Sequence, residues 1–240
     1  MPAARDGLDL GKTLRFFFED PDWVKKGLIG GLFCLLGVFL VGAFFVAGYM
    51  LRTIQRVVRG EERPLPDWDD LGGIFGDGVR AIGVYLIYVL PIVLVPLFVV
   101  VASAVVFGGA ASLAERSREV ADAMGAMFGL VVFGLYGLFA IAMLAVSFYL
   151  PSALVRLALL GRFGAALEWR ENVGFIRRNL GPYVLALAFY LVANFVSQFG
   201  VLLCCVGVFP VTFWSVAVLA YGLGQVARGD AELRVAASAG

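Results

Sequence analysis

The sequence predicts an all-α membrane protein, and three observations support this fold class. Hydrophobic residues make up 61% of the 240 residues and charged residues 15%, whereas soluble domains have roughly 45–50% and about 25%. Stretches 81–107, 124–150 and 183–226 contain no Asp, Glu, Lys or Arg. They also lack the alternation of a transmembrane β-strand. Because backbone in lipid must satisfy its hydrogen bonds internally, we expect helices.

The elements follow from the pattern of apolar runs along the chain. Residues 8–18 place Leu10, Leu14, Phe17 and Phe18 on one face of a short helix lying in the headgroup plane. The apolar runs are 27–51, 81–107, 123–150 and 182–226, separated by a connector at 52–80, a charged loop at 108–122 and a connector at 152–181. Pro91 and Pro96 are expected to bend the second run, and Pro151 to close the third.

The last run is too long for one crossing, so we expect it to fold back near 207–210 into two spans. We therefore predict four full spans plus the first run. Residues 1–229 are expected to form a single transmembrane helical domain, and 230–240 a flexible tail.

The first run, 27–51, is either a re-entrant segment or a fifth span. Its 25 residues are long enough for about 30 Å of hydrocarbon. A re-entrant path, however, places every Lys and Arg except two in the 108–122 loop on one side of the membrane. The positive-inside rule therefore favours the re-entrant segment.

The chain also shows a two-fold internal repeat. Gly60 and Trp68 of the first connector correspond to Gly161 and Trp169 of the second, both at an offset of 101. Each connector carries an apolar stripe at helical spacing, which predicts an interfacial amphipathic helix anchored by tryptophan. Because parallel repeats thread the membrane in the same way, we expect both connectors to face the cytoplasm.

The composition argues against several functions. Histidine is absent, which removes the commonest general base and transition-metal ligand. A net charge of +1 does not suit nucleic acid. Adjacent Cys204 and Cys205 lack metal-site spacing, and with Cys34 we interpret them as small buried hydrophobes. We expect no catalytic residue, no metal site, no cofactor, no nucleic-acid partner and no enzymatic activity.

The first connector contains the most distinctive segment, with candidate functional residues Pro64, Pro66, Asp67, Trp68, Asp69 and Asp70. Its carboxylates are of the type that gathers Mg²⁺ or Ca²⁺. We favour a structural interpretation: a rigid Pro-Leu-Pro turn, a tryptophan anchor, and an acidic start to the next helix, where the macrodipole stabilises negative charge.

Two further groups of residues are candidate sites. Arg52, Arg56 and Arg59 share a helical face, and with Arg177 and Arg178 they are candidates to contact lipid phosphate; the alternative is ordinary topogenic charge. Asn194, Ser197 and Gln198 form a polar stripe in the last run. Such a stripe either lines a cavity or, as we favour, bonds a neighbouring helix.

The pattern of several motifs resembles a known family. The motifs are 20–23 (Asp-Pro-Asp-Trp), 48–52 (Gly-Tyr-Met-Leu-Arg), 59–61 (Arg-Gly-Glu), 65–70 (Leu-Pro-Asp-Trp-Asp-Asp) and 221–225 (Tyr-Gly-Leu-Gly-Gln). Together they resemble the DUF4013 family of prokaryotic multi-spanning membrane proteins over most of residues 16–229. Members often have a proline midway along the first run, where this chain has Leu40. The resemblance implies a multi-pass membrane protein and carries over no catalytic residue.

The functional hypothesis is a non-enzymatic structural or assembly component of a membrane complex in the prokaryotic cytoplasmic (inner) membrane. Its expected partners are membrane lipids and either other copies of itself or other membrane proteins. The alternative is a permease or a lipid-handling protein, because the chain has duplicated halves, a proline-bent span and a polar stripe.

Overall fold

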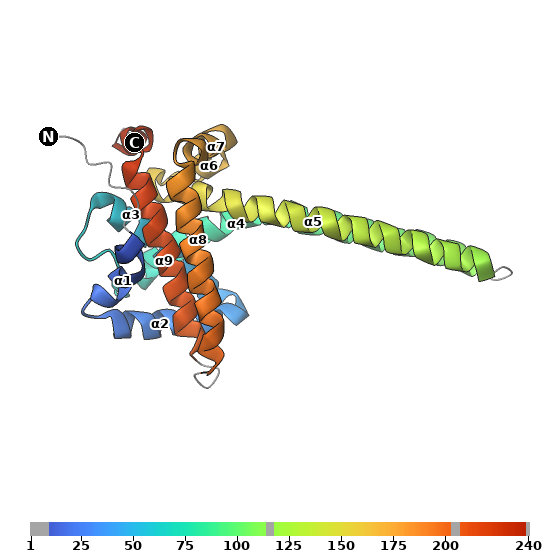
Figure 1. Cartoon of the computed structure of the whole chain (residues 1–240), viewed down its shortest axis with the longest axis horizontal. Coiled ribbons are helices and arrows are strands. Elements are labelled where there is room, and N and C mark those ends of the chain that lie inside the picture. Colours follow the sequence, from blue (N-terminus) through green and yellow to red (C-terminus); the bar gives the residue numbers. More distant parts are fainter. Residues whose placement is uncertain (1–9, 114–117, 203–206, 239–240) are drawn as a thin grey trace. The chain divides into compact units, whose positions relative to one another are not determined.

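The computed structural model describes residues 10–113, 118–202 and 207–238, and every secondary-structure element in these ranges is a helix. The predicted all-α fold is confirmed (Figure 1). In chain order the elements are α1 (Leu10–Glu19), α2 (Trp23–Leu36), the 3₁₀ turn η1 (Gly37–Phe39), α3 (Val41–Arg59), α4 (Leu71–Leu113), α5 (Arg118–Leu160), α6 (Phe163–Leu167), α7 (Trp169–Arg178), α8 (Leu180–Gln198), η2 (Phe199–Leu202), α9 (Val208–Gly229) and α10 (Ala231–Ser238).

Four of these helices, α4, α5, α8 and α9, are long and apolar enough to cross a membrane. They correspond to the four predicted spans, so the chain is an integral membrane protein of polytopic helical type. By contact, the chain divides into two compact units, residues 1–84 with 151–240, and residues 85–150. We call them unit 1 and unit 2.

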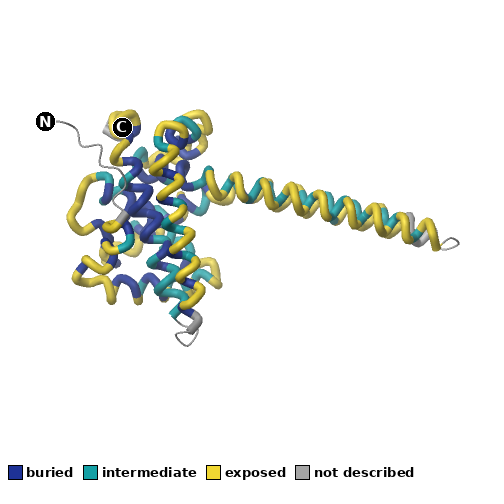
Figure 2. The backbone as a smooth tube through the Cα atoms, in the orientation of Figure 1, coloured by how far each residue is buried: buried dark blue, intermediate teal, exposed yellow. Residues whose placement is uncertain are grey.

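Unit 1 is built around α9, which contacts α1, α2, α3, α8 and α10. Phe213 of α9 lies at the centre of its core, with ring centroids 5.0 Å from Tyr49 and 5.8 Å from Trp68. Phe16 of α1 stacks on Tyr221 at 4.1 Å. Figure 2 shows the buried residues concentrated in this part of the chain.

Glycines allow these helices to approach closely. A Cβ at Gly30 of α2 would overlap the ring of Phe213, and one at Gly224 of α9 would lie 2.6 Å from the Cβ of Val57. A Cβ at Gly48 or Gly78 would overlap a backbone carbonyl of the opposite helix, α4 or α3 respectively. Small residues therefore determine the helix packing inside unit 1.

The first apolar run is a helical hairpin rather than one straight helix. The helix breaks at η1. Leu40, which follows it, has a φ of +67° and is the only described residue other than glycine with a positive φ. The two arms, α2 and α3, contact each other, and Phe33 stacks on Phe45 at 4.3 Å. This matches the re-entrant alternative better than a single continuous span.

Unit 2 consists of the adjoining parts of α4 and α5. Tyr88 lies beside Tyr149, with 3.1 Å between the hydroxyl oxygens, and Phe107 lies 6.0 Å from Phe128. The earlier residue of α4 contacts the later residue of α5, and the later residue of α4 contacts the earlier residue of α5. The two helices therefore pair antiparallel. The side chains along both are largely exposed and apolar.

Several predicted boundaries were wrong. The charged loop expected at 108–122 is shorter, because α4 continues to Leu113 and α5 begins at Arg118. Pro151 does not close the third run; it lies inside α5, which continues to Leu160. The turn between α8 and α9 begins before Gly207, and Cys204 and Cys205 lie outside the described residues.

The tail also differs from the expected flexible segment. Residues 231–238 form α10, and Asp230 before it is buried. Asp230 accepts a hydrogen bond from the backbone N–H of Leu233 at 2.9 Å, which caps the helix.

Candidate functional site

The first connector is held against unit 1 by its own apolar residues. Gly60 ends α3 in the left-handed conformation, and Glu61 N–H donates back to Arg56 O at 3.1 Å, as in a Schellman motif. Beyond it, Pro64, Leu65, Pro66 and Trp68 are all buried. Their burial explains the Pro-Leu-Pro-Asp-Trp pattern as a packed strap rather than a free loop.

Trp68 is a core residue and not the exposed anchor that we expected. Its ring stacks on Tyr49 at 4.5 Å, and its indole N–H donates to Lys26 O at 3.3 Å. The corresponding Trp169 of the second connector is 62% exposed. The two tryptophans therefore have different environments, although Gly60 and Gly161 both end a helix with positive φ.

Lys26 forms a buried ionic cluster that sequence reasoning missed. Its Nζ lies 2.8 Å from Asp20 Oδ2 and 3.0 Å from Asp67 Oδ1, and it donates to Leu65 O at 3.0 Å. The side chains of Lys26 and Asp20 are 6% and 2% exposed. The hydrogen bond from the Lys26 ammonium holds the pKa of Asp67 below its ordinary value. Lys26 thus ties the start of α2 to the connector.

The carboxylates of the connector do not converge on one point. Asp67 turns to Lys26, whereas Asp70 caps α4 by accepting from Gly73 N–H at 2.9 Å. That backbone bond, followed by the Arg52 guanidinium, lowers the pKa of Asp70. Asp70 thus lies at the acidic helix start that the sequence predicted.

Arg52 joins α3 to α4. It pairs with Asp70 at 2.8 Å and with Asp77 at 2.9 Å. Arg56 donates to Leu65 O at 3.2 Å and lies 3.5 Å from Glu61. Two of the predicted lipid-phosphate contacts are therefore engaged inside the protein.

Of the remaining three predicted arginines, Arg178 is also paired within the protein, whereas Arg59 and Arg177 are exposed. Arg59 is largely exposed and lies 3.9 Å from Glu61. Arg178 pairs with Asp230 at 3.2 Å and with Glu232 at 2.7 Å. Arg177 is exposed, and no described carboxylate pairs with it.

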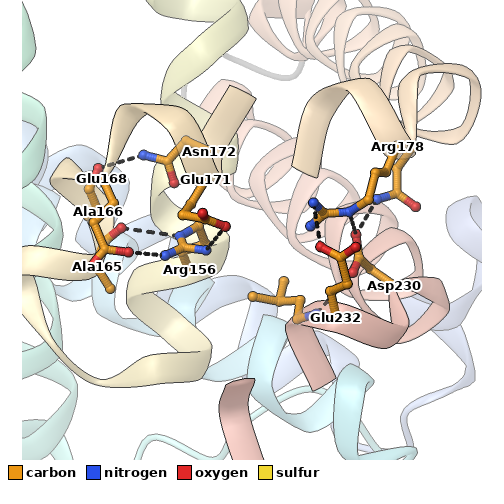
Figure 3. A network of polar contacts seen from close by, with 11 residues as sticks. Arg156, Ala165, Ala166, Glu168, Glu171, Asn172, Arg178, Asp230 and Glu232 are labelled. Carbon is orange, nitrogen blue, oxygen red and sulfur yellow. Dashed lines mark hydrogen bonds and ion pairs between the residues drawn. The ribbon is translucent and has the colours of Figure 1, made fainter. Parts of the chain in front are cut away.

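The second connector has an ionic cluster of its own, drawn in Figure 3. Arg156, buried near the end of α5, forms a short ion pair with Glu168, lies 3.8 Å from Glu171 and donates to Ala165 O at 3.2 Å. Asn172 of α7 donates to Ala166 O at 2.8 Å. In both connectors, an arginine of the preceding helix therefore binds carboxylates of the connector.

The polar stripe of α8 bonds a neighbouring helix at one of its three positions. The Ser197 hydroxyl is buried, and its contacts are Ala193 O at 3.0 Å and Val211 O of α9 at 3.2 Å. Asn194 is half-buried and Gln198 is exposed. Ser197 therefore acts as the interhelical contact that we favoured over a cavity lining.

A small pocket of about 50 Å³ lies between α1, the first connector and α9. Its floor includes the stacked rings of Phe16 and Tyr221, and its rim carries charges of both signs, among them Lys12, Arg63 and Glu62. The mixed charge selects no single class of ligand. Within the described ranges, no three His, Cys, Asp or Glu side chains are grouped to hold a metal ion.

The missed residues had a weak signal in the sequence. The Pro-Asp-Trp motif occurs at 21–23 and 66–68, and the segments that carry it supply Asp20 and Asp67, both of which bind Lys26. Lys26 itself looked like topogenic charge beside Lys25. The pairing of Lys26 with Asp67 depends on a contact between residues 41 positions apart, which no local pattern reveals.

Comparison with known proteins places the chain in a family. No curated protein and no protein of known structure matches it. The family model DUF4013, described as a protein of unknown function, matches residues 31–206. This range contains α3 to α8, the last six residues of α2 and both connectors. Because it covers well over half of the sequence, the chain belongs to the DUF4013 family.

Proposed function

We propose that this protein is a non-enzymatic component of the membrane that assembles with further copies of itself through unit 2. The observation that carries the proposal is the state of the glycines in that unit. A Cβ added at Gly125 or Gly129 of α5 would meet no atom within 4 Å. Among the described residues, no other helix therefore packs against the Cβ position of either glycine.

Glycine has a specific use in membrane helices. Apolar side chains gain nothing from leaving lipid for another apolar surface, so helices associate where small residues allow the backbones to approach. In unit 1, glycines such as Gly30 and Gly48 already allow helices of the same chain to pack closely. In unit 2, Gly125 and Gly129 have the Gly-x-x-x-Gly spacing of a helix-pairing face and are open.

The test is the mass of the particle in mild detergent or lipid nanodiscs. The wild-type protein should be oligomeric, and Gly125→Leu/Gly129→Leu should shift it to monomer. Gly134 lies about half a turn from Gly125 on the helical wheel, so Gly134→Leu is the matched control and should stay oligomeric. A wild-type protein that is a lone monomer in both media would refute the proposal.

The non-enzymatic part of the proposal is supported by the way buried charges are used. Lys26, Arg156 and Asp230 are each held by partners within unit 1. The connector carboxylates are the remaining candidates for chemistry. If Asp67→Ala/Asp69→Ala/Asp70→Ala abolished a cellular phenotype while protein level and oligomeric state were unchanged, the proposal would fail.

We also propose that the protein resides in the prokaryotic cytoplasmic membrane with both connectors in the cytoplasm. Contacts at one end of unit 1 support this: Gln55 of α3 donates to Ala158 O of α5 at 2.7 Å, and Arg178 pairs with Asp230. Labelling of single cysteines near Pro66 and Arg170 in a cysteine-free background should find both on the cytoplasmic side. Labelling from opposite sides would overturn the assignment.

A further inference from the structure

Helix α7 presents three distinct faces, and two of them are occupied within the protein. The first face packs into unit 1 through buried Asn172, Phe175 and Ile176. The second carries Glu171 and Arg178, which lie about 20° apart on the helical wheel. The third face carries the exposed residues Arg170 and Arg177, and exposed Trp169, the first residue of the helix, lies beside Arg170.

The charges of the second face are neutralised by neighbouring segments. Arg156 takes up both Glu168 and Glu171, and Asp230 and Glu232 take up Arg178 (Figure 3). Asn179 also donates to Asp230 at 2.6 Å. The nearby carboxylates are therefore engaged on the second face and do not offset the arginines of the third.

The third face combines an aromatic ring with two cations. Trp169 is 62% exposed, and the guanidinium carbon of Arg170 lies 5.6 Å from the centroid of its ring. Arg177 follows Arg170 by seven residues, which is two helical turns, so both lie on one side with half-buried Val173 between them. No described carboxylate pairs with either arginine. This face carries unbalanced positive charge around an amphipathic ring.

Its position along the chain places this face at the membrane boundary. α7 ends at Arg178, and α8, a candidate span, begins two residues later at Leu180. The residues just before a membrane span lie at headgroup level, where tryptophan is enriched. There, anionic lipids create a negative surface potential, and guanidinium groups match the geometry of phosphate oxygens.

We propose that the Trp169–Arg170–Arg177 face of α7 is a binding site for the headgroup phosphates of anionic phospholipids. The tryptophan ring lies at the headgroup level, and the two arginines bind the phosphates. This assignment replaces Arg178, which is engaged with Asp230 and Glu232, by Arg170. It does not depend on the proposed oligomer, because the face belongs to unit 1.

The test is lipid binding by the full chain in detergent, followed by native mass spectrometry during titration with phosphatidylglycerol or phosphatidylcholine. A cationic side chain near an anionic surface changes binding about five-fold, so Arg170→Gln/Arg177→Gln should weaken phosphatidylglycerol binding about 30-fold. Binding of phosphatidylcholine should stay within about two-fold, since its net charge is zero. Arg170→Lys/Arg177→Lys should retain part of the binding, because the charge remains but the guanidinium geometry is lost.

The control variant is Arg63→Gln/Arg80→Gln. It removes the same charge from two exposed arginines of the first connector that are not among the lipid-phosphate candidates. It should bind phosphatidylglycerol as the wild-type protein does. Equal loss in both double variants would show that only bulk charge matters, and no loss in the α7 variant would show that the lipid binds elsewhere; either result overturns the proposal.

Discussion

Replacement of Lys26 by methionine should destabilise the protein more than replacement of any exposed lysine. The Nζ atom of Lys26 lies 2.8 Å from Asp20, and both side chains are almost fully buried. Lys26→Met keeps much of the side-chain volume but leaves the Asp20 carboxylate without its cation. Breaking a buried pair in this way costs about 3–5 kcal/mol, because the remaining charge is desolvated.

The structure separates this cost from the contribution of Asp67. The Asp67 side chain is 58% exposed, although its oxygen lies 3.0 Å from the same Nζ. Water screens that pair, so Asp67→Asn should cost about 1 kcal/mol or less. Asp20 and Asp67 bind the same ammonium group, but loss of the buried Lys26–Asp20 pair should lower the free energy of unfolding several-fold more than loss of the exposed Lys26–Asp67 pair.

The assay is the free energy of unfolding in detergent micelles, measured by denaturant titration. Lys25→Met is the matched control, because Lys25 is the exposed neighbour and should change stability by less than about 1 kcal/mol. Adding Asp20→Asn to Lys26→Met should recover part of the loss, since the uncompensated charge disappears. If Lys26→Met were no more destabilising than Lys25→Met, the buried cluster would not stabilise the fold.

Three further changes test the fold. Gly78→Ala should destabilise the protein by about 1–3 kcal/mol or more, because the added Cβ would overlap the carbonyl of Phe44. Gly76→Ala is the control on the same helix: its Cβ meets no atom, so the change should be neutral or stabilising by up to about 1 kcal/mol. Thermal unfolding measures both effects. Leu40→Gly should stabilise the α2–α3 hairpin by about 1 kcal/mol, because its φ of +67° is strained for leucine; a loss of stability would contradict this. Burial alone would raise the pKa of Asp230, but its hydrogen bonds from Leu233, Asn179 and Arg178 outweigh this and lower it. Its stabilising effect is therefore present above an ordinary Asp pKa of about 3.9 and is lost as pH falls through the lower folded value, so Asp230→Asn should flatten the acid side of the stability profile.

Much of the architecture was predictable from local composition. Charge-free runs predicted the four helices that are long and apolar enough to cross a membrane. Gly60 and Gly161, which the sequence pattern matched, both have positive φ just after a helix. Boundaries were less predictable. Proline at 151 does not end α5, because the helix can continue through proline where packing supports it.

The candidate site was predictable in position but not in detail. The proline-rich connector and its acidic helix start were found from the sequence, and Asp70 does cap α4. The environment of Trp68 was not found, since an indole at the end of a polar connector suits a headgroup as well as a core. The sequence predicted Arg52 and Arg178 as contacts for lipid phosphate, but in the folded protein they pair with Asp70 and Asp230.

The sequence alone determined that this chain is a helical membrane protein and which runs are long and apolar enough to cross the bilayer, because hydropathy and hydrogen-bond satisfaction act on each segment separately. The tertiary structure decided which charges are free. Lys26, Arg52, Arg156 and Arg178 differ little in sequence context from Arg170 and Arg177, yet each of the first four pairs with at least one carboxylate more than ten positions away along the chain. Electrostatic pairing depends on distances in space, and those exist only after the helices have packed.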